Sequence, residues 1–266
     1  MWICPICQQP LSPVPHGLAC AARHQFDRAR EGYVNLLPVQ QKKSKNPGDN
    51  PAMIEARRRF LHAGHYQPLA EAIRRLLPLV ASDQLLDIGC GEGYYSQYIA
   101  QQMTGLRLLG IDISKAAIKA AAKQSPTHHW AVASAYQLPL ADCSVDAMLR
   151  VYAPSLDSEL LRVLKPDGYL LTVTPAPEHL LQFKQRVYQD VRLHSDEITA
   201  IAGFEHRQRQ RLSWLWQPIA ATDLLALLEM IPLAYKFDEP ARQALAEELP
   251  AIQLDFYLDL YQKPAS

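Results

Sequence analysis

The chain of 266 residues has no apolar segment long enough to cross a membrane, because a spanning helix needs about eighteen or more apolar residues in a row. Residues 219–235 form the most apolar stretch, and Asp223 and Glu229 interrupt it. The N-terminus lacks both the basic and the apolar segments of a secretory signal. The sequence therefore predicts a soluble, cytoplasmic protein with no membrane partner.

The chain also lacks net charge, since 27 Lys and Arg residues balance 27 Asp and Glu residues. The charges are unevenly distributed: residues 1–78 hold 11 basic against 5 acidic residues, and the remainder holds 16 against 22. A basic N-terminal third favours contact with a polyanion. Charge runs more often form a solvated face, so this prediction depends on the motif that the same segment carries.

Cysteine is scarce, with five residues in the chain, yet three of them lie within the first 24 positions. Two residues separate Cys4 from Cys7 and three separate Cys20 from His24, so each pair can bind one side of a tetrahedral ion. Four protein ligands leave no open coordination position, which predicts a structural Zn²⁺ site. His16 is the alternative fourth ligand. A redox Cys-x-x-Cys pair is the alternative function, but that motif belongs in a βαβ setting.

Glycine is sparse too, with 11 residues, and three of them fall within five positions. The apolar run from Leu85 to Ile88 predicts a short strand, and a helix is expected from Tyr94 onward. Glycine accepts positive φ and presents no side chain to a ligand. The sequence therefore predicts a nucleotide-binding turn built on Gly89, Gly91 and Gly93.

Acidic residues indicate which nucleotide this turn binds. Asp87 ends the strand and Glu92 lies inside the turn, where carboxylates would repel a diphosphate and favour a ligand with an amino group. The next apolar strand ends in Asp112, the position from which a carboxylate binds ribose hydroxyls in doubly wound folds. A ribose, an amine and a sulfonium together make up S-adenosylmethionine. An ordinary βα turn with a solvated aspartate is the alternative.

These residues resemble the first two motifs of class I S-adenosylmethionine-dependent methyltransferases. The resemblance implies an α/β, Rossmann-like fold with a seven-stranded, mostly parallel sheet, here preceded by a small zinc-binding domain. It also implies that Tyr66 and His179 contact the cofactor. Ser134 stands where this class usually places an aspartate against the adenine amine, which leaves a hydroxyl and backbone groups for that contact.

The cysteine module runs directly into the segment Phe26–Leu37 ahead of the methyltransferase motifs. This combination, which extends over nearly the whole chain, resembles the large-subunit rRNA guanine-N1 methyltransferases, and in particular the branch named for guanine 745. The resemblance implies methyl transfer to N1 of a guanine in a hairpin of 23S rRNA. The expected organisation is a zinc module for RNA recognition at 1–38, a basic linker and connecting helices at 39–78, and the methyltransferase domain at 79–266. A helical insertion at about 180–202 is expected to cover that domain.

The loop after the fourth strand, residues 152–155, is the predicted catalytic segment, because the carboxyl ends of parallel strands face the ligand. Tyr152 can stack on a flipped base, and Arg150 precedes it as a second catalytic candidate. A tyrosine at a strand end is often only a rim aromatic. The sequence does not identify the group that accepts the guanine N1 proton.

Two other functions share some of these features. A small-molecule methyltransferase would carry the same motifs from Asp87 onward but would have no use for a basic, metal-binding N-terminal third. An RNA-binding protein with an inactive methyltransferase-like domain would bind S-adenosylmethionine without transferring the methyl group. A homodimer that holds the RNA is a further expectation.

Overall fold

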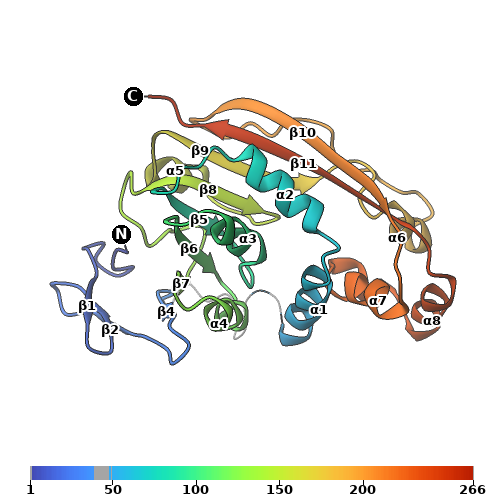
Figure 1. The fold of residues 1–266 in the computed structure, drawn as a ribbon, viewed down its shortest axis with the longest axis horizontal. Helices are drawn as coiled ribbons and strands as arrows, with labels where there is room; N and C mark the ends of the chain where they lie inside the picture. Colours follow the sequence, from blue (N-terminus) through green and yellow to red (C-terminus); the bar gives the residue numbers. More distant parts are fainter. Residues whose placement is uncertain (1, 39–47, 49, 266) are drawn as a thin grey trace.

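The computed structural model of the protein describes residues 2–38, 48 and 50–265. A small antiparallel sheet of order β1-β2-β3 comes first in the chain, built from Ser12–Val14, Gly17–Ala19 and Gln25–Asp27. It lies beside one edge of the large sheet (Figure 1). The start of the predicted basic linker, residues 39–47 and 49, falls outside the described residues.

The large sheet has eight strands among the described residues, in the order β10-β11-β9-β8-β5-β6-β7-β4. The five pairs from β9 through β8, β5, β6 and β7 to β4 are parallel, whereas β10 and β11 run antiparallel at the other end. In chain order the strands are β4 Val34–Asn35, β5 Gln84–Ile88, β6 Arg107–Asp112, β7 His129–Val132, β8 Val145–Val151, β9 Leu164–Pro175, β10 Glu205–Trp216 and β11 Ile252–Gln262.

The eighth strand corrects the predicted number of seven. Strand β4 comes from the N-terminal segment and pairs in parallel with β7, where Val34 aligns with Ala131. Trp2 also forms a bridge to Leu140 and is buried among residues of the large domain. The N-terminal segment thus shares its core with one edge of the sheet, which composition alone could not indicate because the pairing partners are about a hundred residues apart.

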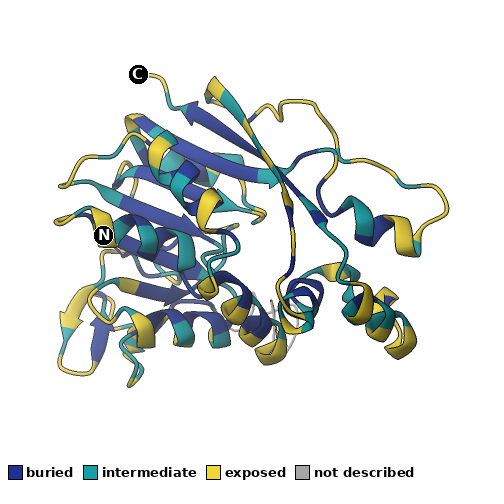
Figure 2. Cartoon of the chain, turned by 45° about the vertical axis from the view of Figure 1, so that its right-hand side comes forward, coloured by how far each residue is buried: buried dark blue, intermediate teal, exposed yellow. Residues whose placement is uncertain are grey.

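Helices cover both faces of the sheet, whose strands are largely buried (Figure 2). Helices α2, α3 and α4 contribute to the core on one face, and α5 packs on the other face together with Trp2 and Leu18. The bounds are α1 Pro51–His62, α2 Gln67–Leu76, α3 Tyr94–Gln102, α4 Lys115–Gln124, α5 Asp157–Val163, α6 Leu181–Val187, α7 Ala221–Glu229 and α8 Glu239–Glu248, with a 3-10 helix at Pro232–Lys236. None of the described helices has the length and hydropathy that a bilayer crossing requires.

The predicted helical insertion at about 180–202 is helical only in α6, over Leu181–Val187. Beyond it, the carbonyl oxygens of Asp196 and Glu197 accept hydrogen bonds from the guanidinium of Arg209 on β10, at 2.6 and 3.1 Å. Ser195 Oγ accepts from the amide of Glu197, a local turn that competes with helix formation. These contacts hold the segment against the sheet in an irregular conformation.

Candidate functional site

A cavity of about 1090 Å³ lies at the carboxyl ends of the parallel strands. This is the edge at which open α/β sheets bind ligands. Nine residues that the sequence predicts for the site line the cavity: Tyr66, Asp87, Gly89, Gly91, Glu92, Asp112, Ser134, Tyr152 and His179. Gly93 and Arg150 do not line it.

The glycine turn between β5 and α3 allows a ligand to approach the backbone closely. Gly91 has a φ of 57°, and a Cβ at this position would meet no atom within 4 Å, so its backbone faces open space. Gly89 has a φ of 66°, and a Cβ there would lie 2.4 Å from the Cβ of Ala153. Gly93 instead permits packing, because a Cβ would lie 2.5 Å from the Trp130 ring. The cradle at Gly91 therefore fits a ligand that presses against bare backbone.

Asp112 holds this turn in place. Its Oδ2 accepts a hydrogen bond from the amide of Gly91 at 2.9 Å, and its Oδ1 accepts one from the amide of Ser114 at 2.7 Å. A carboxylate has about four acceptor positions. A carboxylate at this position fits the ribose hydroxyls of an adenosine group, and the contact itself stays a prediction.

Two further acids, Asp87 and Glu92, line this part of the cavity. Burial and, to a smaller extent, the nearby carboxylate of Asp112 together raise the pKa of Asp87 to about 7. Burial likewise raises the pKa of Glu92, whose Oε1 lies 3.3 Å from Nε2 of His62. A bound cation would relieve the cost of keeping these carboxylates ionised. The residues present therefore fit the amine and the sulfonium of S-adenosylmethionine.

A pH dependence of cofactor binding follows from Asp87. Because its pKa is about 7, the carboxyl is protonated in most molecules below that pH, and a cationic ligand must displace the proton. We expect the affinity for S-adenosylmethionine, measured by calorimetry, to fall by up to about tenfold for each pH unit below 7 and to level off above it. Proton release should accompany binding at acidic pH. The control is Asp87→Asn, which should bind more weakly with a flatter pH profile; an unchanged slope in this variant would contradict the assignment.

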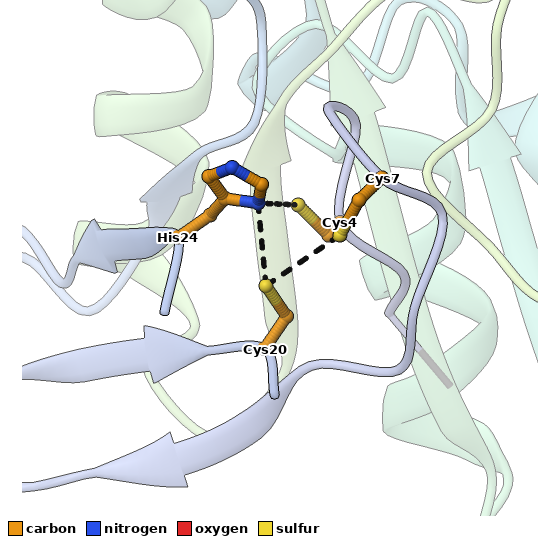
Figure 3. A group of neighbouring side chains, drawn as sticks. All are labelled: Cys4, Cys7, Cys20 and His24. Atoms are coloured by element: carbon orange, nitrogen blue, oxygen red, sulfur yellow. Dashed lines mark hydrogen bonds between the residues drawn. The ribbon is translucent and has the colours of Figure 1, made fainter. Parts of the chain in front are cut away.

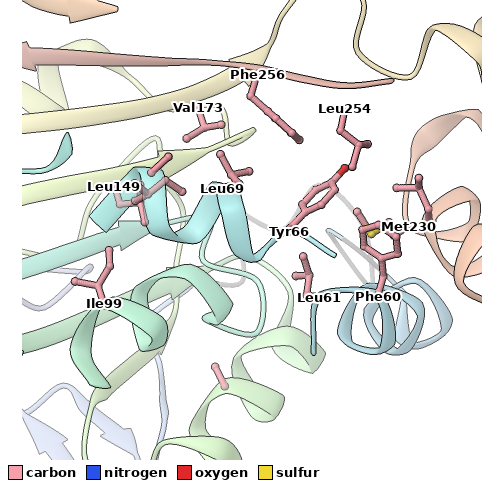
Figure 4. Packing of buried hydrophobic residues seen from close by; sticks show 14 of the residues in the cluster. Phe60, Leu61, Tyr66, Leu69, Ile99, Leu149, Val173, Met230, Leu254 and Phe256 are labelled. Carbon is pink, nitrogen blue, oxygen red and sulfur yellow. The ribbon is translucent and has the colours of Figure 1, made fainter. Parts of the chain in front are cut away.

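Tyr66 forms part of the cavity wall and is buried against aromatic rings (Figure 4). Its ring packs edge-on against Phe60 and Phe256, with centroids 5.0 and 5.3 Å apart. These contacts fix the position of the ring. Tyr66 is thus a rigid wall that a cofactor can lie against.

His179 is a neutral hydrogen-bond donor toward the cavity. Its Nδ1 lies 3.2 Å from the amide nitrogen of Asp255, an N–H that can only donate, so Nε2 carries the hydrogen of the neutral ring. Burial lowers the pKa of His179 to about 3, which keeps the ring uncharged. Nε2 lies 3.5 Å from the hydroxyl of Tyr152. His179 can therefore donate to a ligand but cannot accept a proton through Nε2.

Tyr152 and Arg150, at the end of β8, have side chains in different surroundings. Tyr152 has a positive φ of 54° and lines the cavity with its ring half exposed. A non-glycine residue in this conformation is uncommon and is found more often at functional sites. Arg150 instead donates to Oγ of Ser155 at 2.7 Å, away from the cavity lining. Tyr152 thus lines the cavity, where its contact with a flipped base stays a prediction, whereas Arg150 does not line it.

Ser134 lines the cavity, and its contact with the adenine stays a prediction. Its Oγ accepts a hydrogen bond from the amide of Tyr136 at 3.2 Å, so the hydroxyl also stabilises the local turn. Tyr136 is exposed and also lines the cavity. The hydroxyl hydrogen of Ser134 remains for an adenine nitrogen.

Another part of the cavity was not predicted from the sequence. Its wall comes from α6, the irregular segment after it and residues near α7, and includes Lys184, Tyr188, Asp190, Arg192, His194 and Met230. The only signal in the sequence was the expectation that residues 180–202 cover the domain. A segment that covers the domain beside the cofactor site can form the part of the cavity wall that contacts the substrate.

The four predicted metal ligands converge at the N-terminus (Figure 3). Their ligand atoms lie within 4.8 Å of one another, and Nδ1 of His24 is 3.5 Å from Sγ of Cys4 and 3.4 Å from Sγ of Cys20. The sulfurs of Cys7 and Cys20 are 3.6 Å apart. Zinc bonds of about 2.3 Å to sulfur and 2.0 Å to nitrogen place tetrahedral ligands roughly 3.5–3.8 Å apart. The donor set therefore fits Zn²⁺, with His24, not His16, as the fourth ligand.

The glycine turn, the acid that ends β6 and the parallel sheet define the molecule as a class I methyltransferase. Residues 86–172 match the family described as "Methyltransferase domain". The structure of geranyl diphosphate methyltransferase in complex with SAM has the same fold, with a TM-score of 0.50 and 16% identity over 82% of this chain and 93% of that chain. The predicted fold class is thus confirmed.

The N-terminal segment then indicates the particular family. Residues 2–45 match the zinc-ribbon family described as "RlmA, N-terminal". A Micromonospora griseorubida protein with the provisional name 23S rRNA (guanine-N(1)-)-methyltransferase is 36% identical over 273 residues, which cover 90% of this chain and 88% of the relative. The 23S rRNA (guanine(748)-N(1))-methyltransferase of Streptomyces fradiae is 38% identical over 184 residues, 67% of this chain and 65% of the relative. The chain belongs to the 23S rRNA (guanine-N1)-methyltransferase family.

Proposed function

We propose that this protein transfers a methyl group from S-adenosylmethionine to N1 of a guanine in a hairpin of 23S rRNA. The observation that carries the proposal is that one chain joins a four-ligand cluster suited to zinc with an acid-lined cavity at the carboxyl edge of a methyltransferase sheet. A small-molecule methyltransferase needs the cavity alone. An rRNA substrate also supports a cytoplasmic location. The homodimer stays a prediction.

The cavity can position both reactants. S-adenosylmethionine supplies an electrophilic methyl group; Asp112 and the glycine turn would hold its adenosine, and Asp87 and Tyr66 would hold its amino acid end. The target base must leave its stack in the RNA to reach the cavity, and Tyr152 offers a half-exposed ring on which it can stack. Alignment of N1 with the methyl group contributes to the rate of such a transfer.

The N-terminal module is proposed to capture the RNA. Its zinc site leaves no open coordination position, so the metal stabilises the module and takes no part in the chemistry. The module packs on the edge of the sheet through β4 and Trp2. This position allows a hairpin to contact the module and the methyltransferase domain together.

Primer extension tests the proposed function. Purified protein is incubated with S-adenosylmethionine and unmodified 23S rRNA, and reverse transcriptase is run through the hairpin. We expect one new stop, because a methyl group on guanine N1 blocks base pairing. An RNA with adenine at that guanine should show no stop. Cofactor binding without any stop would support the inactive RNA-binding alternative, and transfer to small molecules alone would overturn the proposal.

A further inference from the structure

Lys184 is a charged side chain without a partner in the wall of the cavity. The residue is 92% buried, and its Nζ has no hydrogen-bond partner among the described residues. Burial lowers the pKa of its ammonium group. An unpaired amine in such a place costs free energy that a bound ligand with an acceptor atom would recover. The position therefore indicates a ligand contact.

The neighbours of Lys184 indicate which ligand lies there. Lys184 is close enough to His179 and His194 to lower the pKa of both rings, and His179 in turn lies beside Tyr152. All four residues line the cavity. The three acids that fit the cofactor, Asp87, Glu92 and Asp112, lie in or beside the glycine turn, and none of them contributes to the shifted pKa of Lys184. Lys184 thus belongs to the end of the cavity where the predicted substrate loop is found.

The other charged groups at this end do not neutralise Lys184. Asp190, Arg192 and, from α1, Arg57 line the cavity, and His179 and His194 lie near the amine. The carboxylate of Asp255 acts on both histidine rings and is itself paired with Arg211. Both Asp190 and Arg192 are exposed to solvent. No carboxylate contributes to the shifted pKa of Lys184. The amine is therefore free to donate to an uncharged acceptor on a substrate.

We propose that Lys184 donates a hydrogen bond to O6 of the target guanine, selecting this base and stabilising it once N1 has lost its proton. The inference rests on the proposed function. Guanine presents acceptors at O6 and N7, whereas adenine presents an amino group at the position of O6, so an amine donor discriminates between them.

The contact also assists the reaction. The N1–H bond breaks and its proton passes to water, which leaves a negative charge shared between N1 and O6. The N1 electron pair forms the new bond to the methyl carbon while the carbon–sulfur bond breaks, and its electron pair stays on sulfur. A donor placed at O6 stabilises the charge at the moment when it develops.

Single-turnover kinetics of Lys184→Met test the inference. At saturating RNA and cofactor we expect a rate about 100-fold below that of the wild type, the loss typical of removing one such donor. Binding of S-adenosylmethionine should stay within about twofold. The pH profile should move to higher pH by one unit or more, because N1 is less acidic without the donor. Lys184→Arg, which keeps a donor, should recover most of the rate.

The matched control is Lys165→Met, because Lys165 pairs with Asp146 at the opposite end of the sheet. This variant should keep the wild-type rate and pH profile. Weakened cofactor binding in Lys184→Met would overturn the inference, because it would show that the amine contacts S-adenosylmethionine instead. An unchanged rate or an unshifted pH profile in this variant would overturn it as well. If the wild type itself produces no stop on 23S rRNA, that result contradicts the proposed function. It is distinct from a failure of the Lys184 contact, which appears only in the comparison of variants.

Discussion

Serine at both Cys4 and Cys20 is expected to remove about one zinc ion per chain and to lower the rate of rRNA methylation by at least about 100-fold. The two cysteines come from different ligand pairs, so the double variant leaves one ligand in each. Structural zinc contributes roughly 10 kcal/mol or more to the folding of small domains. The strands of the module are only three residues long, and they cannot form a core without the metal.

Binding of S-adenosylmethionine should be affected far less, by no more than about threefold. The predicted cofactor residues Asp87 and Asp112 lie on β5 and β6, whereas the module joins the sheet through its own strand β4, which pairs with β7. Zinc content by elemental analysis, cofactor affinity by calorimetry and primer extension on 23S rRNA measure the three effects. The separation between cofactor affinity and RNA methylation is the result that assigns the module to the RNA.

Cys143→Ser is the matched control, since Cys143 is an exposed cysteine outside the metal cluster. It should keep the metal, the cofactor affinity and the activity of the wild type. Retention of zinc in the double variant would refute the metal assignment. An equal loss of cofactor affinity and RNA methylation would show that the module mainly supports the sheet, through β4 and the buried Trp2.

The sequence predicted the parts of the fold whose signal is local. Strand β5 ends at Ile88 and α3 begins at Tyr94, as the apolar run and the glycine turn predict. The metal cluster was also predictable, because its ligands come in two short pairs. Helix α6 was predicted too long, since the carbonyls beyond it bond to Arg209 on a strand that follows later.

The residues of the site were likewise predictable only where a local pattern marks them. Asp87, Asp112 and the glycines follow strands directly, and parallel topology brings such positions to one edge. Lys184 and His194 carry no motif, and they reach the cavity only because α6 packs on β11. A strand formed by the N-terminal segment at the far edge likewise depends on contacts that no local pattern reports. Long-range packing thus decides the substrate side of the cavity.

Asp112→Asn is expected to weaken S-adenosylmethionine binding by about 100-fold or more, although the change removes no atom from the side chain skeleton. Asp112 accepts from the amides of Gly91 and Ser114 through different oxygens. Asparagine has only one oxygen, so one of these N–H groups would face an NH₂ donor. The glycine turn would have to shift. Loss of a hydrogen bond to a charged group costs roughly 1.5–3 kcal/mol, before the lost ribose contacts are added.

Asp142→Asn is the control, because Asp142 is an exposed aspartate that pairs with Arg162 and does not line the cavity. Calorimetry should give wild-type affinity for this variant. Fluorescence-monitored unfolding should show that Asp112→Asn remains folded, since Ile111 and the rest of β6 stay buried. Near-normal affinity in Asp112→Asn would mean that the ribose lies elsewhere in the cavity. Asp112 would then only stabilise the glycine turn. The orientation proposed for S-adenosylmethionine and the guanine in the cavity would have to be reversed.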